Sequence, residues 1–205
     1  IVNADGVVFK QGFGYADMET QKAFTTTSLM NIGSISKTMT GICLAKLIEE
    51  GKLNWNTPIN DFLPFKIYNP HHRKIPITIE HLAKHTSSIV DPEDYVDLYN
   101  SNEEMPAIKF IENMIHPLGQ WYSKKNFSRK KPGTKYIYSN MGAAIAGHIV
   151  ETVSGMPFED YARRIILTPL SMQQSGSMLN EIDQENFVSI YTSNNQKIPP
   201  YNLIP

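Results

Sequence analysis

The pattern Ser34-Ile35-Ser36-Lys37 places a hydroxyl and an amine three residues apart in a segment with helical spacing of apolar residues. Residues three apart lie on one face of a helix, so Lys37 is expected beside the Ser34 hydroxyl. Ser34 falls at the expected helix start, where free backbone N–H groups and the helix dipole favour negative charge. The same environment disfavours a protonated amine, so Lys37 could accept a proton and activate Ser34 as a nucleophile for acyl transfer.

The Ser-x-x-Lys pattern is weak evidence by itself, because serine and lysine are common residues. The chain contains a second match, Ser128-Arg129-Lys130-Lys131, in a basic loop before Pro132-Gly133 with no apolar helix behind it. We interpret the second match as a coincidence. For Ser34 alone, a helix-capping serine beside a surface lysine is an equally good interpretation.

A second polar group, Tyr138-Ser139-Asn140, precedes another expected helix. A phenol near a lysine ammonium loses its proton more easily and can then serve as a general base. Asn140 offers both a donor and an acceptor, and could hold Lys37 and a substrate carbonyl in place. Taken alone, an aromatic core residue followed by an asparagine helix cap is the better interpretation.

The two patterns together, about a hundred residues apart, resemble the serine β-lactamase-like superfamily in its class C β-lactamase and penicillin-binding-protein branch. The resemblance extends along most of the chain. Further segments that are similar to this family are 31–38, 47–53, 82–88, 132–136 and 157–172. One departure is Ser88, which stands in a turn where the family usually has glycine.

The resemblance implies an α+β fold of the β-lactamase/transpeptidase type, with an antiparallel sheet and an all-helical insertion. It implies that Ser34 is the nucleophile and that its backbone N–H is an oxyanion donor. Lys37 and Tyr138 would share the proton transfers, in an order that the sequence does not assign, and Asn140 would position Lys37 and substrate. The implied activity is hydrolysis of amide, ester or β-lactam carbonyls in small molecules or peptides, as in β-lactamases, D-Ala-D-Ala carboxypeptidases and esterases, without a metal or organic cofactor.

Two alternatives stay open. A non-catalytic penicillin-binding or sensor protein could keep the same fold and the same nucleophile without turnover. A helical interaction module in which both motifs are coincidental is the more remote one, because the matching segments follow one another in the family's order.

We expect residues 1–205 to form one incomplete domain of this fold. Its parts would be a hairpin with the nucleophile helix at 1–54, a mainly helical insertion at 55–178 and an irregular tail at 179–205. The family's third motif, Lys-Thr-Gly or His-x-Gly on a sheet strand, is absent, and with it the C-terminal strands that would pair with the hairpin and the second oxyanion donor. Because the loss of one such donor typically costs a factor of roughly 100 to 1,000 in rate, we expect the chain alone to be inactive.

Local patterns predict the elements that carry these residues. Asp5-Gly6 between apolar residues predicts a β-hairpin at 1–9, with a second strand that continues to Tyr15. Apolar spacing, with glycine and proline at segment ends, predicts helices at 34–50, 79–85, 106–115, 140–153 and 157–167. Residues 180–205 show little pattern.

Composition limits the remaining function classes. With a formal charge of −1 and 41% hydrophobic residues, the chain can form a packed core and is not built as a general binder of nucleic acid or anionic membranes. The single cysteine, Cys43, excludes an internal disulfide and a cysteine-based metal site. No apolar run is long enough for a transmembrane helix. The resemblance favours a periplasmic or extracellular location, and the sequence does not indicate an oligomeric state.

Two weaker signals remain. His81 and His85 have a helical spacing that can bind zinc, but the sequence offers no clear third ligand, so we predict no metal site. The basic run within 124–131 is interpreted as a solvated loop, with contact to an acidic partner or lipid as the lesser alternative.

Overall fold

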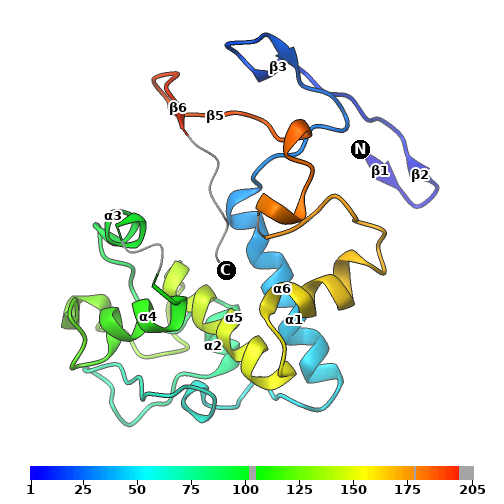
Figure 1. Cartoon of the computed structure of the whole chain (residues 1–205). Helices are drawn as coiled ribbons and strands as arrows, with labels where there is room; N and C mark the ends of the chain where they lie inside the picture. The colour runs from blue at the N-terminus through cyan, green and yellow to red at the C-terminus, as the bar shows by residue number, and fades with distance from the viewer. Residues whose placement is uncertain (102–104, 178, 199–205) are drawn as a thin grey trace. The chain divides into compact units, whose positions relative to one another are not determined.

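The computed structural model describes residues 1–101, 105–177 and 179–198, which form two compact units (Figure 1). One unit contains residues 1–33 and the described residues from 170 onward. The other runs from Ser34 to Pro169. All four predicted catalytic residues belong to this second unit, so the geometry among them is defined within a single compact body.

The 34–169 unit is helical in its described part. Its α-helices are α1 (Lys37–Glu49), α2 (Ile79–Ala83), α3 (Tyr95–Asn100), α4 (Ala107–Ile115), α5 (Asn140–Ser154) and α6 (Phe158–Ala162). Shorter turns are η1 (Gly33–Ser36), η2 (Ile59–Asp61), η3 (Lys124–Asn126) and the π-helical η4 (Arg163–Leu167). Helix α5 is central, since it packs against α1, α2, α4 and α6, and Figure 1 shows it between α4 and the pair α1 and α6.

The core of this unit forms where α1 and α5 meet. Ile145 and Ile149 of α5 and Cys43 and Leu47 of α1 are all fully buried. Burial of one large aliphatic side chain contributes about 1.5–3 kcal/mol. Packing of this strength fixes the two helices relative to each other, and therefore fixes the relative position of their N-terminal ends.

The predicted helix at 34–50 is correct over most of its length and wrong at its start. Helix α1 begins at Lys37, and Ser34 lies in the preceding turn η1. Two of the apolar residues in this segment, Ile35 and Ile42, are 64% and 47% exposed. The buried face of α1 is therefore narrower than the spacing of apolar residues suggested.

Helix α5 (Asn140–Ser154) confirms the predicted helix at 140–153, but the interpretation of Asn140 as its cap is wrong, because Asn140 is the first helical residue. The Ser139 hydroxyl caps the N-terminus by accepting a hydrogen bond from the Gly142 N–H at 3.0 Å. Gly155 ends the helix in the left-handed conformation, with φ of 69°, which glycine adopts without steric cost.

The other helices of the unit match with smaller differences. Helices α2 and α4 lie within the predicted segments 79–85 and 106–115. The predicted helix at 157–167 divides into α6 and the π-helical turn η4. Helix α3 was not predicted.

The other unit contains short antiparallel strands. They are β1 (Val2–Asn3), β2 (Gly6–Val7), β3 (Tyr15–Asp17), β4 (Lys22–Ala23), β5 (Ile190–Tyr191) and β6 (Lys197–Ile198), with the turns η5 (Leu179–Glu181) and η6 (Gln184–Asn186). Strands β1 and β2 form the hairpin predicted around Asp5-Gly6, with Val2 opposite Val7. The predicted continuation of the second strand to Tyr15 is wrong, because Tyr15 begins β3, which pairs with β4.

The tail after residue 179 is more ordered than predicted, because β5 and β6 pair with each other and the segment around them contacts the start of the chain. The Ser189 N–H donates to the Ala16 carbonyl at 2.8 Å, and Lys197 Nζ donates to Asp17 Oδ2 at 2.7 Å. The Lys197 ammonium, with further hydrogen bonds, holds the pKa of Asp17 far below its usual value. These contacts join segments that are more than 170 residues apart in the sequence, so no local pattern could have indicated them.

The predicted α+β class is confirmed: helices dominate, and the strands form small antiparallel pairs. Within the described residues, no helix is both long enough and apolar enough to cross a membrane.

Candidate active site

Three of the predicted residues converge on one oxygen atom. Lys37 Nζ donates a hydrogen bond to Ser34 Oγ at 3.2 Å, and Tyr138 Oη donates to the same Ser34 Oγ at 2.6 Å. Lys37 Nζ also lies 5.2 Å from the centre of the Tyr138 ring. Ser34 is exposed, so its hydroxyl is accessible to a substrate while it contacts a basic amine and a phenol.

Two helix starts bring these groups together. Ser34 lies in η1, directly before α1, and Lys37 is the first residue of α1. Gly33 precedes them with φ of 53°, a left-handed backbone that favours glycine. Tyr138 lies two residues before α5. The Ser34 N–H is in the first turn of a helical segment, where backbone donors lack intrahelical acceptors.

The charge on Lys37 changes the acidity of the phenol. Burial raises the pKa of Tyr138, but hydrogen bonding with Lys37 and Ser34 and the charge of Lys37 outweigh burial, so the pKa of Tyr138 lies below its usual value of 10. A phenol with a lowered pKa is a better proton acceptor near neutral pH than an ordinary tyrosine. The arrangement can therefore take the proton of the Ser34 hydroxyl.

Asn140 lies close to this group in the chain but is not joined to it by a hydrogen bond. Its backbone N–H donates to Asp91 Oδ2 at 2.6 Å. Its half-buried side chain makes no hydrogen bond with any described residue. The predicted contact between the Asn140 amide and Lys37 stays a prediction.

Asp91 is a residue of the site that the sequence did not reveal. Its Oδ1 accepts hydrogen bonds from Ser139 Oγ at 2.7 Å and from the Met141 N–H at 3.2 Å, and its Oδ2 accepts from the Asn140 N–H. A carboxylate at the N-terminus of α5 is also favoured by the helix dipole. Asp91 thus fixes the turn that carries Tyr138. The only sequence signal was its place three residues after the segment 82–88.

His85 supports the same turn from the other side. Its ring stacks on the Tyr138 ring, with 4.7 Å between centroids and 29° between planes. Its Nδ1 accepts a hydrogen bond from the Ser139 N–H at 3.3 Å. Burial and then the Lys37 charge lower the pKa of His85, against the opposing effect of Asp91. A neutral ring can accept the Ser139 hydrogen bond and adds no positive charge beside Lys37.

The two histidines considered for zinc have separate structural roles. His81 Nδ1 accepts a hydrogen bond from the Thr78 N–H at 3.2 Å and completes the N-terminal cap of α2, whereas His85 contacts Tyr138 and Ser139. No cluster of three or more histidine, cysteine, aspartate or glutamate residues suited to a metal ion occurs within 1–101, 105–177 and 179–198.

The second Ser-x-x-Lys match differs from the first in its contacts. Ser128 Oγ accepts a hydrogen bond from the backbone N–H of Lys130 at 3.1 Å, and so closes a local turn. Unlike Ser34, it has no hydrogen bond to a lysine or tyrosine side chain among the described residues.

Ser88 stands where the β-lactamase-like superfamily usually has glycine, and its backbone is left-handed, with φ of 68°. Non-glycine residues are disfavoured there by roughly 1–2 kcal/mol. The buried Ser88 hydroxyl accepts a hydrogen bond from Asn69 Nδ2 at 2.8 Å, which offsets part of that cost.

Residues 1–202 match the beta-lactamase family. The chain therefore belongs to the beta-lactamase family, and its fold is of the β-lactamase/transpeptidase type, as predicted.

Named relatives include penicillin-binding protein 4* of Bacillus subtilis (strain 168), 27% identical over 177 residues that make up 85% of this chain and 37% of that protein. The mouse mitochondrial serine beta-lactamase-like protein LACTB is 25% identical, over 93% of this chain and 44% of that protein. The chain thus spans less than half of the length of these relatives.

Solved structures of related proteins share the fold over most of this chain. The octameric penicillin-binding protein homologue from Pyrococcus abyssi superposes with a TM-score of 0.72 at 28% identity, over 97% of this chain and 44% of that one. A class C beta lactamase superposes with a TM-score of 0.66 at 20% identity, over 92% of this chain and 48% of that one, which shows the shared fold.

Proposed function

We propose that the protein is a serine hydrolase that acts through an acyl-enzyme on amide, ester or β-lactam carbonyls. The observation that carries the proposal is the pair of hydrogen bonds that Ser34 Oγ accepts from Lys37 and Tyr138. Membership of the beta-lactamase family supports the same class of chemistry.

The first step is acylation of Ser34. Tyr138 as a phenolate, stabilised by the Lys37 ammonium, removes the proton of the Ser34 hydroxyl, and Ser34 Oγ attacks the carbonyl carbon. The Ser34 N–H donates to the oxyanion that forms. The leaving group departs with the proton returned by Tyr138, and the acyl group remains on Ser34 Oγ.

The second step is release of the acyl group. A water molecule gives a proton to Tyr138 as it attacks the ester carbonyl, and Tyr138 passes that proton to Ser34 Oγ as the ester C–O bond breaks and the acid leaves. In this proposal Asn140 positions the substrate carbonyl, and Asp91 and His85 act through the Tyr138 turn without touching substrate.

The proposed substrates are small molecules or peptides. Relatives named as penicillin-binding proteins favour β-lactams, D-amino-acid peptides are proposed from the resemblance to D-Ala-D-Ala carboxypeptidases, and the exposed nucleophile also suits simple esters. We also propose a periplasmic or extracellular location, in keeping with that substrate class.

Efficient turnover is proposed to need more than residues 1–205. The chain spans 37% of the Bacillus relative, and its own sequence lacks a Lys-Thr-Gly or His-x-Gly strand that would supply a second oxyanion donor. Without that second donor, we expect the chain alone to be slower by a factor of roughly 100 to 1,000.

A penicillin-binding or sensor protein is the second candidate, favoured by the names of the relatives. Kinetics with a chromogenic β-lactam and a p-nitrophenyl ester separate the two. Repeated turnover that Ser34→Ala abolishes supports a hydrolase, whereas one equivalent of product without turnover supports a sensor. Turnover that survives Ser34→Ala contradicts both. The test uses the 205-residue chain and, where the gene encodes more, the longer product.

A further inference from the structure

Positive charge is concentrated in two segments of a chain that is nearly neutral overall. Nine of the 19 lysine and arginine residues lie within 62–79 and 113–150. These two segments contain none of the chain's 20 aspartate and glutamate residues. A net charge of −1 therefore hides a strongly basic region and a correspondingly acidic remainder.

The fold brings the two segments together on the 34–169 unit. Asn69 Nδ2 donates to the Ser128 carbonyl at 2.8 Å, and His72 Nε2 lies 2.8 Å from the Arg129 carbonyl. The loop that follows His72 therefore lies beside the loop around Arg129. Eight of the nine cations in these segments, all of them exposed, are here called the basic surface. They are Lys66, Arg73, Lys74, Lys124, Lys125, Arg129, Lys130 and Lys131.

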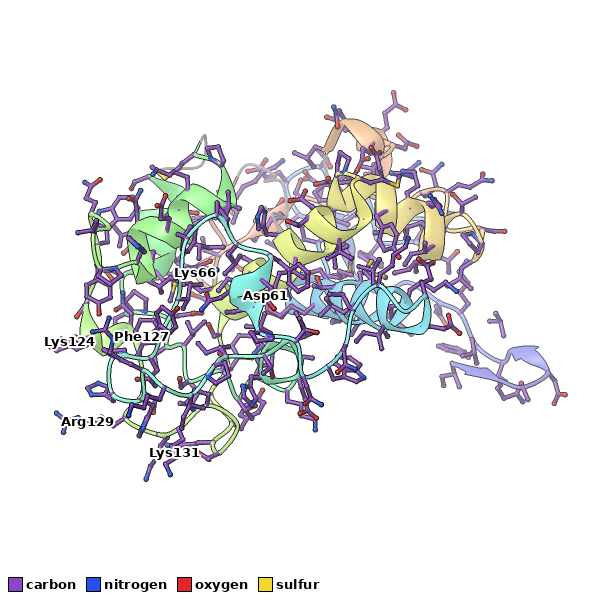
Figure 2. All side chains as sticks on the ribbon, turned by 90° about the horizontal axis from the view of Figure 1, so that it is seen from below. Asp61, Lys66, Lys124, Phe127, Arg129 and Lys131 are labelled. Carbon is purple, nitrogen blue, oxygen red and sulfur yellow. The ribbon has the colours of Figure 1, made fainter. Side chains whose placement is uncertain are left out.

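Figure 2 shows Lys124, Arg129 and Lys131 directed outward along one edge of this unit, with Phe127 inside them. Phe127 is 3% exposed, and the adjacent Asn126 side chain donates to the Met114 carbonyl at 2.7 Å. The loop that carries the cations is thus held in place from below, so the charges belong to a fixed surface.

The cations of the basic surface are not neutralised within the chain. No ion pair joins any of the eight to a carboxylate of a described residue. Other lysines of the same unit do pair with glutamates: Lys46 with Glu49, Lys84 with Glu80, and Lys109 with Glu112. Asp61 lies near Lys66 in Figure 2, but Lys66 Nζ donates to the Asn60 carbonyl and forms no ion pair with Asp61. Clustered like charges repel one another, and binding of an anionic partner would remove that cost.

Two exposed apolar side chains accompany the cations. Tyr68, two residues after Lys66, is 44% exposed, and Leu118 is 89% exposed. The loop of Leu118 reaches the same region, because the His116 ring packs 5.9 Å from the ring of Phe65. The phosphate backbone of a nucleic acid offers no apolar partner to an aliphatic side chain, whereas the acyl-chain boundary of a membrane does.

We propose that the basic surface, with Leu118 and Tyr68, binds the surface of a membrane rich in anionic phospholipids. The cations attract the lipid phosphates, and the two apolar side chains enter the interface between headgroups and acyl chains. The chain would then lie on the membrane without spanning it. This inference does not depend on the proposed acyl-transfer activity.

The test is co-sedimentation of the chain with phosphatidylcholine vesicles, with and without phosphatidylglycerol. We expect binding that requires phosphatidylglycerol and weakens above about 0.1 M salt, where the Debye length is about 10 Å. The variant Arg129→Gln/Lys130→Gln/Lys131→Gln should bind about 100-fold more weakly, since each cation near an anionic membrane strengthens binding about fivefold. Its fold is retained, because the contacts of Asn69 and His72 are made to backbone carbonyls.

The matched control is Lys46→Gln/Lys84→Gln/Lys109→Gln, which removes the same charge from elsewhere on the unit and should bind as the unchanged chain does. Leu118→Ser should weaken vesicle binding about tenfold, since it removes an aliphatic side chain that is exposed in the chain and buried in the membrane interface on binding. No binding to anionic vesicles, equal loss in the control, or tighter binding to a DNA duplex with no effect of Leu118→Ser would each overturn the proposal.

Discussion

Replacement of Asp91 by alanine should destabilise the 34–169 unit and misplace the catalytic turn. The substitution removes an ionised acceptor from the Ser139 hydroxyl and from the N–H groups of Asn140 and Met141. A hydrogen bond to a charged group contributes about 1.5–3 kcal/mol, and water can replace part of the loss because Asp91 is half-buried. We therefore expect Asp91→Ala to lower the free energy of unfolding by about 3 kcal/mol.

The same substitution should slow acylation more than it weakens substrate binding. Tyr138 and Asn140 flank Ser139, so the loss of Asp91 frees both side chains to move away from Ser34. A displacement of about 1 Å can reduce a rate about 100-fold. Pre-steady-state acylation by a chromogenic β-lactam, measured against concentration, separates the maximal acylation rate from the apparent binding constant. The rate should fall about 100-fold with little change in the binding constant.

Asp97→Ala is the matched control, because it removes an exposed aspartate from α3 nearby. It should leave both quantities unchanged. A surface substitution changes the free energy of unfolding by no more than about 0.5 kcal/mol. If Asp91→Ala stays within that range and also acylates at the rate of the unchanged chain, Asp91 does not hold the catalytic turn.

Three further predictions follow from the same geometry. The acylation rate should rise with pH, with a midpoint at the Tyr138 pKa, which lies below 10. Lys37→Met should move the midpoint of this pH profile upward, and an unmoved midpoint would contradict the assignment of Tyr138 as base. Ser88→Gly should be more stable than Ser88→Ala by about 1 kcal/mol in chemical denaturation, because only glycine relieves the left-handed backbone; equal stabilities would exclude that strain. Because burial and Lys37 lower the pKa of His85 in the folded chain, the unfolded chain binds more protons, so the free energy of unfolding should fall as pH drops below about 6.5. His85→Gln should make that fall shallower between about pH 6.5 and 5, and an unchanged slope would show that His85 does not contribute.

The sequence could predict the parts of the site that depend on short spacing. Ser34 and Lys37 meet because three residues separate them at a helix start, whether that start is α-helical or a tighter turn. Helix α5 was located because its apolar spacing and its Gly155 end are local signals, whereas the Ser139 cap was not recognised in the sequence. The approach of Tyr138 to Ser34 came from the family resemblance, since no local pattern joins residues 104 positions apart.

Contacts between distant polar residues could not be predicted in the same way. Asp91 stabilises the start of α5 from about fifty positions away, and an Asp-Pro pair has no spacing that reveals such a partner. The short strands around residues 190–198 could not be predicted either, because they lack an apolar alternation of their own. They are stabilised by pairing with each other and by the contact of Lys197 with Asp17. The charge of the basic surface was visible in the sequence, but its assembly from two loops was not.

Intact-protein mass spectrometry with a fluorophosphonate and, separately, a reactive β-lactam tests the central claim most directly. Ser34, activated by Lys37 and Tyr138, should gain one covalent adduct from each reagent on the chain or its longer gene product, and peptide mapping should place the adduct on Ser34. Ser34→Ala should abolish the mass gain, and Ser128→Ala should leave it intact. An adduct that persists in Ser34→Ala, or none on the longer gene product, would contradict the account.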